Sequence, residues 1–484
     1  MHPAELGLPY DSYRPVQEHA LAWAQQTDKR ILLLEAPPGV GKSLIGAAWG
    51  RLFAGQRGAI LTRTLSLLGQ YERTIGLPAI RGAGNFTCQT WSNRLGRRIT
   101  CEQAGDRCAF DKTRDCPYWK QRLEGAQAAQ SVVSYAYALS SWQWRQELHY
   151  LVCDEGHNVI DQLTEWQAIR LPLELDPPED LSILAVWARG KFGAWNAQKP
   201  ADDQLEKLVI WKKAMGNLER ACRIKADDLY VMSRSKTSLV LSPVWPKPQY
   251  LWQYRNLLMS ATLYGGGLLA DLFDLAPGTW DYLAVPSPFS VSRRPCYIAA
   301  FVPMNKDAGD DAFRQMASNI AWVMAKYPGE KGLIHVSSYS QVQRLQKYLA
   351  DDGLPIIYHY NATRDKRAAL FNRFRHTPGA WLLSPSAGEG EDFPYEAARV
   401  NVIAKVPYPD LGDPIMKARR ADGKLGATFY SALACARVAQ AYGRSMRAED
   451  DWGHTWILDA AFWNLLKFNR ELLPNYLREA IIRV

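Results

Sequence analysis

Apolar and polar positions alternate along the chain in a pattern that predicts short buried strands separated by helices. Each apolar run has the length and composition of a buried strand, and the stretches between the runs show helical spacing. This alternation favours parallel sheets covered by helices, and therefore an α/β fold. The runs that we expect to form strands are residues 31–34, 59–62, 150–153, 256–259, 332–336, 380–383, 400–406 and 455–458.

The pattern is interrupted twice, and the interruptions indicate how the domains are arranged. Residues 80–125 are rich in cysteine, arginine and turn-forming residues, whereas residues 165–245 read as mainly helical. Since 484 residues are too many for one compact core, we expect two α/β domains. The first covers residues 1–265 and carries both segments as insertions. The second covers residues 275–484 and follows a join rich in glycine and proline.

The stretch LLEAPPGVGKSL (residues 33–44) resembles a phosphate-binding loop, although the strict pattern G-x-x-x-x-G-K-[ST] has glycine in place of Ala36. It follows a predicted strand and precedes a predicted helix. Glycines here can take positive φ angles, so that backbone N–H groups surround the phosphates, while Lys42 reaches the β- and γ-phosphates and Ser43 reaches Mg²⁺. An incidental turn is the alternative. The residues assigned to the nucleotide are Pro38, Gly39, Val40, Gly41, Lys42 and Ser43, and Lys42 is also assigned to catalysis.

A second nucleotide signal is LVCDEGHNV (residues 151–159), in which a predicted strand runs into two adjacent carboxylates. Adjacent residues at the end of a strand point in different directions. Asp154 can therefore hold Mg²⁺ through its water shell, while Glu155 polarises the attacking water as a general base. A solvated turn is the alternative, and the preceding strand and phosphate-binding loop favour the catalytic interpretation.

Near the end of the chain, QAYGRSMR (residues 440–447) combines a glutamine with two arginines. Spacings of four and three residues place Gln440, Arg444 and Arg447 on one face of a helix. An arginine that reaches a γ-phosphate stabilises the charge of the transferring group, so we assign these three residues to catalysis. A solvated basic helix face is the alternative. The C-terminal half has no second phosphate-binding loop, as expected if ATP lies between two domains.

The order of these motifs resembles that of superfamily 2 helicases of the DEAH kind, and specifically of the XPD/DinG-like branch. The resemblance runs through most of the chain, with Gly156 where the DEAH box has alanine. The segments that carry it are YRPVQ (13–17), LTRTLSLLGQY (61–71), DEGH (154–157), MSATL (259–263), VSSYSQVQRL (336–345), GEGEDF (388–393) and QAYGRSMR (440–447).

The resemblance implies a fold and further site residues. Two RecA-like domains would sandwich ATP and Mg²⁺, with Arg14 and Gln17 as contacts of the adenine. Asp392 occupies the acidic position of the GEGEDF segment. Ser260 and Thr262 would couple hydrolysis to movement, and the LTRTLSLLGQY segment would touch the DNA backbone.

Four of the eight cysteines lie within 29 residues, and this clustering is typical of a metal centre rather than of disulfides. The resemblance implies that they hold a [4Fe–4S] cluster in the first insertion. The spacings of twelve, six and seven intervening residues lack the C-x₂-C pair of most structural zinc sites, and zinc or unligated thiols are the alternatives. The four are Cys88, Cys101, Cys108 and Cys116, whereas Cys153, Cys222, Cys296 and Cys435 are expected in the core.

The resemblance also implies a path for single-stranded DNA. Residues 165–245 occupy the place of the family's arch domain, although the segment is short. Tyr135 and Tyr137 are candidates either for lining the strand path or for packing. Basic residues of the first insertion are candidates for phosphate contacts. These are Arg94, Arg97, Arg98, Arg107, Lys112, Arg114 and Lys120.

The composition agrees with a nucleic-acid partner without requiring one. The formal net charge is +9 at pH 7, which favours polyanionic partners. No run of 18 apolar residues and no signal peptide occur, so we expect a cytoplasmic monomer that binds no membrane. The expected function is that of an ATP-dependent DNA helicase, 5′ to 3′ by resemblance, acting on single strands, forks and tailed duplexes. The alternatives are a DNA-stimulated ATPase that remodels protein–DNA complexes and a P-loop transferase or kinase.

Overall fold

The computed structural model describes residues 2–53, 55–105, 116–201, 204–225, 228–350, 353–361, 363–385, 397–444 and 451–484. Contacts between residues divide the chain into two compact units, which we describe separately. The first unit comprises Met1–Ser12, Gly46–Leu258 and Leu411–Ala421, and the second comprises Tyr13–Ile45, Met259–Asp410 and Asp422–Val484.

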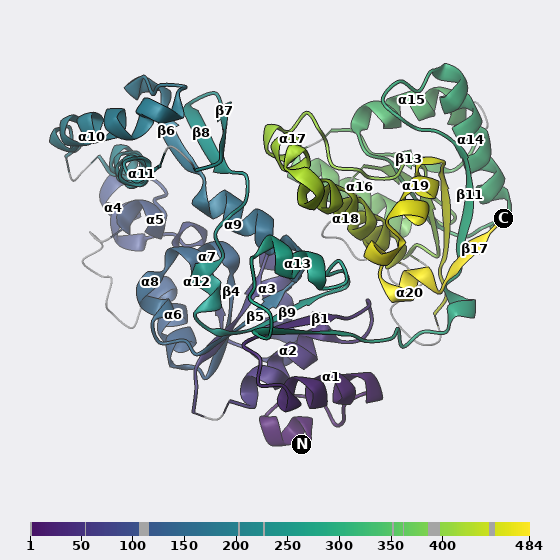
Figure 1. The fold of residues 1–484 in the computed structure, drawn as a ribbon, viewed down its shortest axis with the longest axis horizontal. Helices are drawn as coiled ribbons and strands as arrows, with labels where there is room; N and C mark the ends of the chain where they lie inside the picture. Colours follow the sequence, from purple (N-terminus) through teal and green to yellow (C-terminus); the bar gives the residue numbers. More distant parts are fainter. Residues whose placement is uncertain are drawn as a thin grey trace. The chain divides into compact units, whose positions relative to one another are not determined.

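Two seven-stranded sheets form the framework of the protein (Figure 1). The strand pairs of the first sheet whose register is defined are all parallel. Its strands, in spatial order, are β10 (Trp280–Ala284), β1 (Ile31–Glu35), β9 (Arg255–Ser260), β5 (Tyr150–Asp154), β2 (Gly58–Thr62), β4 (Gln130–Ser134) and β3 (Ala79–Ile80).

The second sheet is also parallel in every pair with a defined register. It confirms the prediction of an α/β protein with two parallel-sheet domains. Its strands, in spatial order, are β13 (Ile356–Tyr358), β14 (Trp381–Ser384), β12 (Gly332–His335), β15 (Val400–Ile403), β16 (His454–Asp459), β11 (Cys296–Val302) and β17 (Ile481–Arg483).

All eight apolar runs that were expected to form strands do so, as β1, β2, β5, β9, β12, β14, β15 and β16. Every residue of β1, β2 and β5 is buried. Parallel strands covered on both faces are continuous apolar runs, and for this reason they are visible in the sequence.

The first sheet extends further along the chain than the expected domain boundary at residue 265. Its edge strand β10 pairs with β1 in parallel, from Ile31 with Trp280 to Glu35 with Ala284. All five residues of β10 are only half-buried. Because an edge strand of this kind has no continuous apolar run, the sequence pattern did not reveal it.

Helices connect the strands, as the alternating pattern predicted. Among the described residues, no helix is long and apolar enough to cross a membrane. The helices are α1 (Pro15–Gln26), α2 (Lys42–Arg51), α3 (Leu65–Ile75), α4 (Gln89–Leu95), α5 (Cys101–Ala104), α6 (Pro117–Gln127), α7 (Tyr135–Ser140), α8 (Trp142–Arg145), α9 (Val159–Gln167), α10 (Leu181–Ala197), α11 (Leu205–Ala221), α12 (Gln249–Trp252), α13 (Gly267–Leu272), α14 (Asp310–Ala325), α15 (Tyr339–Leu349), α16 (Arg364–His376), α17 (Pro414–Ala421), α18 (Gly423–Tyr442), α19 (Ala461–Phe468) and α20 (Asn475–Arg478).

The segment 165–245 is a small α+β body rather than a mainly helical one. It holds α10 and α11 together with an antiparallel three-stranded sheet, which Figure 1 shows as one group. Leu184, Leu218 and Leu241 are buried at the core that the helices and the sheet share. The long helices dominate the sequence pattern, and the short strands escape it. The strands are β6 (Ile169–Pro172), β8 (Ser238–Pro243) and β7 (Tyr230–Arg234).

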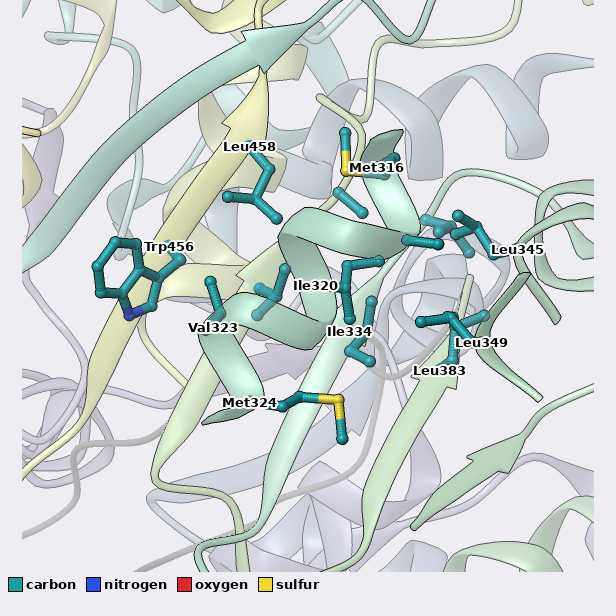
Figure 2. Close-up of a cluster of buried hydrophobic side chains, with 14 of the residues drawn as sticks. Met316, Ile320, Val323, Met324, Ile334, Leu345, Leu349, Leu383, Trp456 and Leu458 are labelled. Carbon is teal, nitrogen blue, oxygen red and sulfur yellow. The ribbon is translucent and has the colours of Figure 1, made fainter. Parts of the chain in front are cut away.

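The core of the second sheet shows why this half folds as it does (Figure 2). Met316, Ile320 and Val323 repeat at helical spacing along α14 and face the sheet. They meet Ile334 of β12 and Leu458 of β16, and the whole cluster is nearly free of solvent. This packing fixes the helix on the sheet and thereby the ends of the strands that carry the motifs.

Candidate active site

The phosphate-binding loop has the backbone that its sequence predicted. Gly39 and Gly41 have φ angles of 81° and 84°, in the left-handed region that favours glycine. A Cβ atom built on Gly39 would lie 2.2 Å from Cζ of Phe289, so no side chain fits there. Ala36, by contrast, has no positive φ angle, and its N–H donates a hydrogen bond of 2.8 Å to the Ser260 carbonyl oxygen. Alanine is therefore compatible with the loop at the position where the strict pattern has glycine.

Lys42 and Ser43 are the first two residues of α2, directly after the loop. The Lys42 Nζ atom donates a hydrogen bond of 3.1 Å to the Ala36 carbonyl oxygen and lies 3.5 Å from that of Pro37. The ammonium group is thus held inside the curve of the loop. Ser43 is half-buried beside it. The roles of the two side chains toward a triphosphate and its metal ion stay predictions.

Arg14 and Gln17 both contact the phosphate-binding loop itself. The Arg14 guanidinium donates to the Gly39 carbonyl oxygen at 2.6 Å, and the buried Gln17 amide donates to that of Val40 at 2.8 Å. The Arg14 N–H in turn donates to Gln17 Oε1 at 2.9 Å. Their role as adenine contacts stays a prediction, and in this structure the two side chains brace the loop.

Glu35 is a site residue that the sequence interpretation missed. It is the last residue of β1, it is 5% exposed, and its Oε2 atom accepts a hydrogen bond of 2.7 Å from the Leu263 N–H. Burial raises the pKa of Glu35, while hydrogen bonds from the backbone of Leu263 and Gly265 and from Tyr282 oppose the shift. The carboxylate thus joins the end of β1 to the MSATL segment. A charged residue closing an apolar run was the signal in the sequence.

Asp154 is buried at the end of β5 with its carboxylate fixed from two sides. Its Oδ2 atom accepts a hydrogen bond of 2.9 Å from the Tyr71 hydroxyl, and its Oδ1 atom accepts one of 2.9 Å from the Glu155 N–H. The Asp154 carbonyl oxygen accepts a further bond of 3.1 Å from the Tyr135 hydroxyl. These hydrogen bonds orient the carboxylate that the sequence assigns to Mg²⁺.

Glu155 adopts a strained backbone with a φ of 51°, one of four non-glycine residues of the described chain with a positive φ. Such outliers persist where the surrounding structure over-determines them, and they cluster at functional sites. The side chain is 37% exposed, and its Oε2 atom lies 3.3 Å from Nδ1 of His157. The carboxylate is accessible to water, and its role as a general base stays a prediction.

Tyr135 and Tyr137 are packing residues and do not line a strand path. They begin helix α7 and are 1% and 8% exposed. The Ser134 hydroxyl accepts a hydrogen bond from the Tyr137 N–H and caps the helix at this point. Of the two alternatives for these tyrosines, lining the strand path or packing, their burial favours packing.

Helix α18 ends at Tyr442, so Gln440 and Arg444 do not share one regular helix as their spacing suggested. Both side chains are half-buried, and Gly443 caps the helix with its N–H bonded to the Ala439 carbonyl oxygen. A Cβ atom on Gly443 would lie 2.6 Å from Cγ of Pro38, which brings this turn against the phosphate-binding loop within the second unit. The turn that follows α18, rather than a face of the helix, therefore brings Arg444 close to the phosphate-binding loop.

His335 is a second residue that the sequence interpretation missed. It ends β12 in a buried position, with Nε2 3.4 Å from Oδ1 of Asn401. Burial lowers the pKa of His335 to about 4, the contact with Asn401 opposes the shift, and the charge of Arg444 adds to it. The imidazole is therefore neutral beside Arg444 at neutral pH.

Three predicted site residues lie outside the described residues. They are Arg447, Asp392 of the GEGEDF segment and Cys108, and their assignments stay predictions. The basic residues Arg107, Lys112 and Arg114 lie outside the described ranges as well. Of the remaining basic residues in the first insertion, Arg97 forms an exposed ion pair of 2.6 Å with Glu206.

The three described cysteines of the first insertion all stand at the start of helices. Cys88 and Cys116 cap α4 and α6, and Cys101 is the first residue of α5. Hydrogen bonds from the Cys88 N–H to Ile99 and from the Cys101 N–H to Phe86 bring the first two side by side. Burial raises the pKa of Tyr118, and electrostatic interactions with Cys101 and Cys116 add to the shift. The Tyr118 side chain therefore lies near Cys101 and Cys116.

This arrangement is compatible with a metal cluster but does not establish one. In the part of the chain that the structure describes, no three His, Cys, Asp or Glu side chains are close enough together to hold a metal ion. Cys88 lies at the edge of a small apolar cluster with Trp91 and Ile99, which would exclude water from a bound group. The soft thiolate donors suit an iron–sulfur cluster or zinc.

Comparison with known proteins finds similarity to helicases. The family model described as "Helicase C-terminal domain" matches residues 320–480. The chain is 25% identical over 264 residues to "ATP-dependent helicase DinG" of Mycobacterium tuberculosis, and equally to that of Mycobacterium bovis. These matches cover 52% of this chain and 38% of the curated relatives, so the chain matches well under half of their length.

Solved structures give the same answer for the fold. The chain resembles a structure named "XPD_Helicase" with a TM-score of 0.62 and 15% identity, over 98% of this chain and 100% of that one. It also resembles Xpd4 of S. tokodaii with a TM-score of 0.58 and 15% identity, over 97% and 100%. The fold is therefore that of two RecA-like domains. In sequence the chain is similar to DinG helicases, and in fold it is similar to XPD structures.

Proposed function

We propose that the protein is an ATP-dependent DNA helicase that translocates on single-stranded DNA and unwinds duplex DNA. The observation that carries the proposal is the pairing of a phosphate-binding loop after β1 with a buried, doubly hydrogen-bonded Asp154 after β5. Both strands belong to one parallel sheet. This combination is the one that phosphoryl transfer from a nucleoside triphosphate requires.

The proposed roles follow from the chemistry of each side chain. The N–H groups of residues 38–43 and the Lys42 ammonium bind the phosphates, and Ser43 and Asp154 hold Mg²⁺. Bound Mg²⁺ neutralises charge on the phosphate oxygens. Glu155 orients the attacking water and accepts its proton. Gln440, Arg444 and Arg447 act on the transferring phosphoryl group, where an arginine stabilises spreading negative charge.

The proposed partner is single-stranded DNA, including forks and tailed duplexes. The net charge of +9 and the basic first insertion support binding to phosphates. Contacts of this kind carry little sequence preference. Movement from 5′ to 3′ is proposed from the likeness to the XPD/DinG-like branch. We propose that the chain acts as a monomer, with or without recruitment by other proteins.

We further propose that Cys88, Cys101, Cys108 and Cys116 hold a [4Fe–4S] cluster. When bound, the cluster ties the three short helices of the insertion together. Anaerobically purified protein is expected to contain about four iron atoms per chain and to absorb visible light. Cys116→Ser should lose both signals, whereas Cys222→Ser, a half-buried cysteine of the second insertion, should keep them. Stoichiometric zinc without visible absorbance would refute the proposal.

The test of the ATPase is hydrolysis with and without single-stranded DNA. Single strands should raise the kcat of the unmodified protein, and Lys42→Ala should abolish turnover because the ammonium group of the loop is lost. Stimulation by single strands in a protein that never displaces a duplex strand would favour the alternative, an ATPase that remodels protein–DNA complexes. Hydrolysis that no nucleic acid stimulates would contradict both.

A further inference from the structure

Tyr71 connects two functional segments that lie far apart in the sequence. Its side chain is completely buried, and its hydroxyl donates a hydrogen bond of 2.9 Å to Oδ2 of Asp154, 83 residues further along the chain. Tyr71 belongs to α3, the helix that continues the LTRTLSLLGQY segment. A buried tyrosine hydroxyl requires a polar partner, and here the partner is the carboxylate assigned to Mg²⁺.

A second contact joins the same two segments a few residues away. The Arg63 guanidinium donates a hydrogen bond of 3.3 Å to Oδ1 of Asn158, which follows the DEGH box. Between Arg63 and Tyr71, the Thr64 side chain caps α3 by accepting from the Leu67 N–H at 3.2 Å. The residues from Arg63 to Tyr71 therefore form one ordered piece that touches the DEGH region at both ends.

The hydrogen bond from Tyr71 restricts how Asp154 can turn. The Glu155 N–H holds one carboxylate oxygen and the Tyr71 hydroxyl holds the other, so the plane of the carboxylate is set. Without the hydroxyl, the hydrogen bond that holds Oδ2 is lost, and rotation about the last side-chain bond is less restricted. Hydrogen bonds to a metal-binding carboxylate orient it and tune its affinity for the ion.

We propose that Tyr71 is a positioning residue that aligns Asp154 for Mg²⁺ and passes movement of α3 to the metal site. This inference rests on the proposed function and on the expectation that the LTRTLSLLGQY segment, which leads into α3, contacts the DNA backbone. A strand that engages this segment displaces the start of α3, and the rigid helix carries the displacement to Tyr71. The hydroxyl then changes the orientation of Asp154, which links the presence of DNA to hydrolysis.

The test is Tyr71→Phe, which removes the hydroxyl and keeps the ring in the core. Tyr150→Phe is the matched control, because Tyr150 begins the same strand β5 that Asp154 ends, and its hydroxyl bonds to the Ala129 carbonyl oxygen at 3.4 Å. The first readout is the Mg²⁺ dependence of binding a fluorescent ATP analogue, without turnover. The second is the ratio of ATPase rates with and without single-stranded DNA. Thermal unfolding of both variants reports any loss of fold.

Tyr71→Phe is expected to raise the Mg²⁺ concentration needed for nucleotide binding by about 10-fold, at the low end of effects from partners of metal ligands. It should also lower the stimulation by DNA more than the basal rate, whereas Tyr150→Phe leaves both unchanged. Equal Mg²⁺ affinity in the two variants would overturn the positioning role. Weaker Mg²⁺ binding with an unchanged stimulation ratio would overturn the link to α3. If the unmodified protein responded to no DNA, the proposed function would fail, and the Mg²⁺ titration would still decide the role of Tyr71.

Discussion

Replacing His335 by glutamine tests the electrostatic environment of Arg444. In the native protein the imidazole is buried and its pKa is lowered from 6.5 to about 4, first by burial and further by the charge of Arg444. A lowered pKa means that the unfolded chain binds a proton more readily than the native protein, so acid favours unfolding. This loss of stability is absent well above pH 6.5 and grows as the pH falls toward 4.

The size of this effect follows from the two pKa values. At about pH 5 the unfolded histidine is mostly protonated and the native one mostly neutral, so the free energy of unfolding falls by about 2 kcal/mol, at about 1.4 kcal/mol per pKa unit. Glutamine is neutral at both pH values, and its amide can still donate to Oδ1 of Asn401. The His335→Gln protein should therefore lack this part of the acid sensitivity.

The assay is urea unfolding followed by tryptophan fluorescence, at about pH 5 and about pH 7.5, for both proteins. For each protein, the change in the free energy of unfolding between the two pH values is taken. Comparing this change between the two proteins cancels the contributions of the titrating groups that they share. The exposed His376 at the end of α16 provides a control, and His376→Gln should behave like the unmodified protein. An equal loss of stability in the unmodified and His335→Gln proteins would refute the reasoning.

Three further predictions concern the loop, the general base and a buried arginine. Gly39→Ala should weaken ATP binding by about 10-fold in a fluorescence titration, because a positive φ costs alanine about 1–2 kcal/mol. Ala36→Gly is the control and should keep the affinity for ATP. Unchanged affinity in Gly39→Ala would contradict the account. Glu155→Gln should lower the kcat of ATP hydrolysis by about 100-fold with binding retained, and turnover near the native rate would exclude Glu155 as the base. Arg419 is 2% exposed and donates hydrogen bonds to the Val244 carbonyl oxygen, Thr164 Oγ1 and Asp161 Oδ1. Arg419→Ala should therefore destabilise α17 by about 3 kcal/mol, measured by hydrogen exchange, whereas Arg420→Ala at an exposed position should not. Equal exchange in the two variants would contradict the anchoring role of Arg419.

The sequence predicted those features that depend on neighbouring residues. The buried strands are continuous apolar runs, and β1, β2 and β5 are buried along their whole length. The phosphate-binding loop follows from local glycine chemistry, and Gly39 and Gly41 take the positive φ angles that it requires. The order of the motifs along the sequence carries the resemblance to XPD/DinG-like helicases.

Features that depend on distant residues could not be predicted in the same way. The bond between Tyr71 and Asp154 joins residues 83 positions apart, and the contact of Leu263 with Glu35 spans 228 positions. The helical spacing from Gln440 to Arg447 suggested one helix face, but Gly443 ends the helix where the chain meets Pro38. Such outcomes are set by tertiary packing, which overrides local preference.

The central claim is most directly tested by strand displacement on partial duplexes that carry either a 5′ or a 3′ single-stranded tail. Anaerobically purified protein is used with ATP and Mg²⁺, beside Lys42→Ala. The account predicts unwinding from the 5′ tail only, and none in the variant. Unwinding from the 3′ tail only would keep the motor and contradict the assigned direction. The absence of unwinding from either tail, in protein that still hydrolyses ATP, would contradict the helicase assignment.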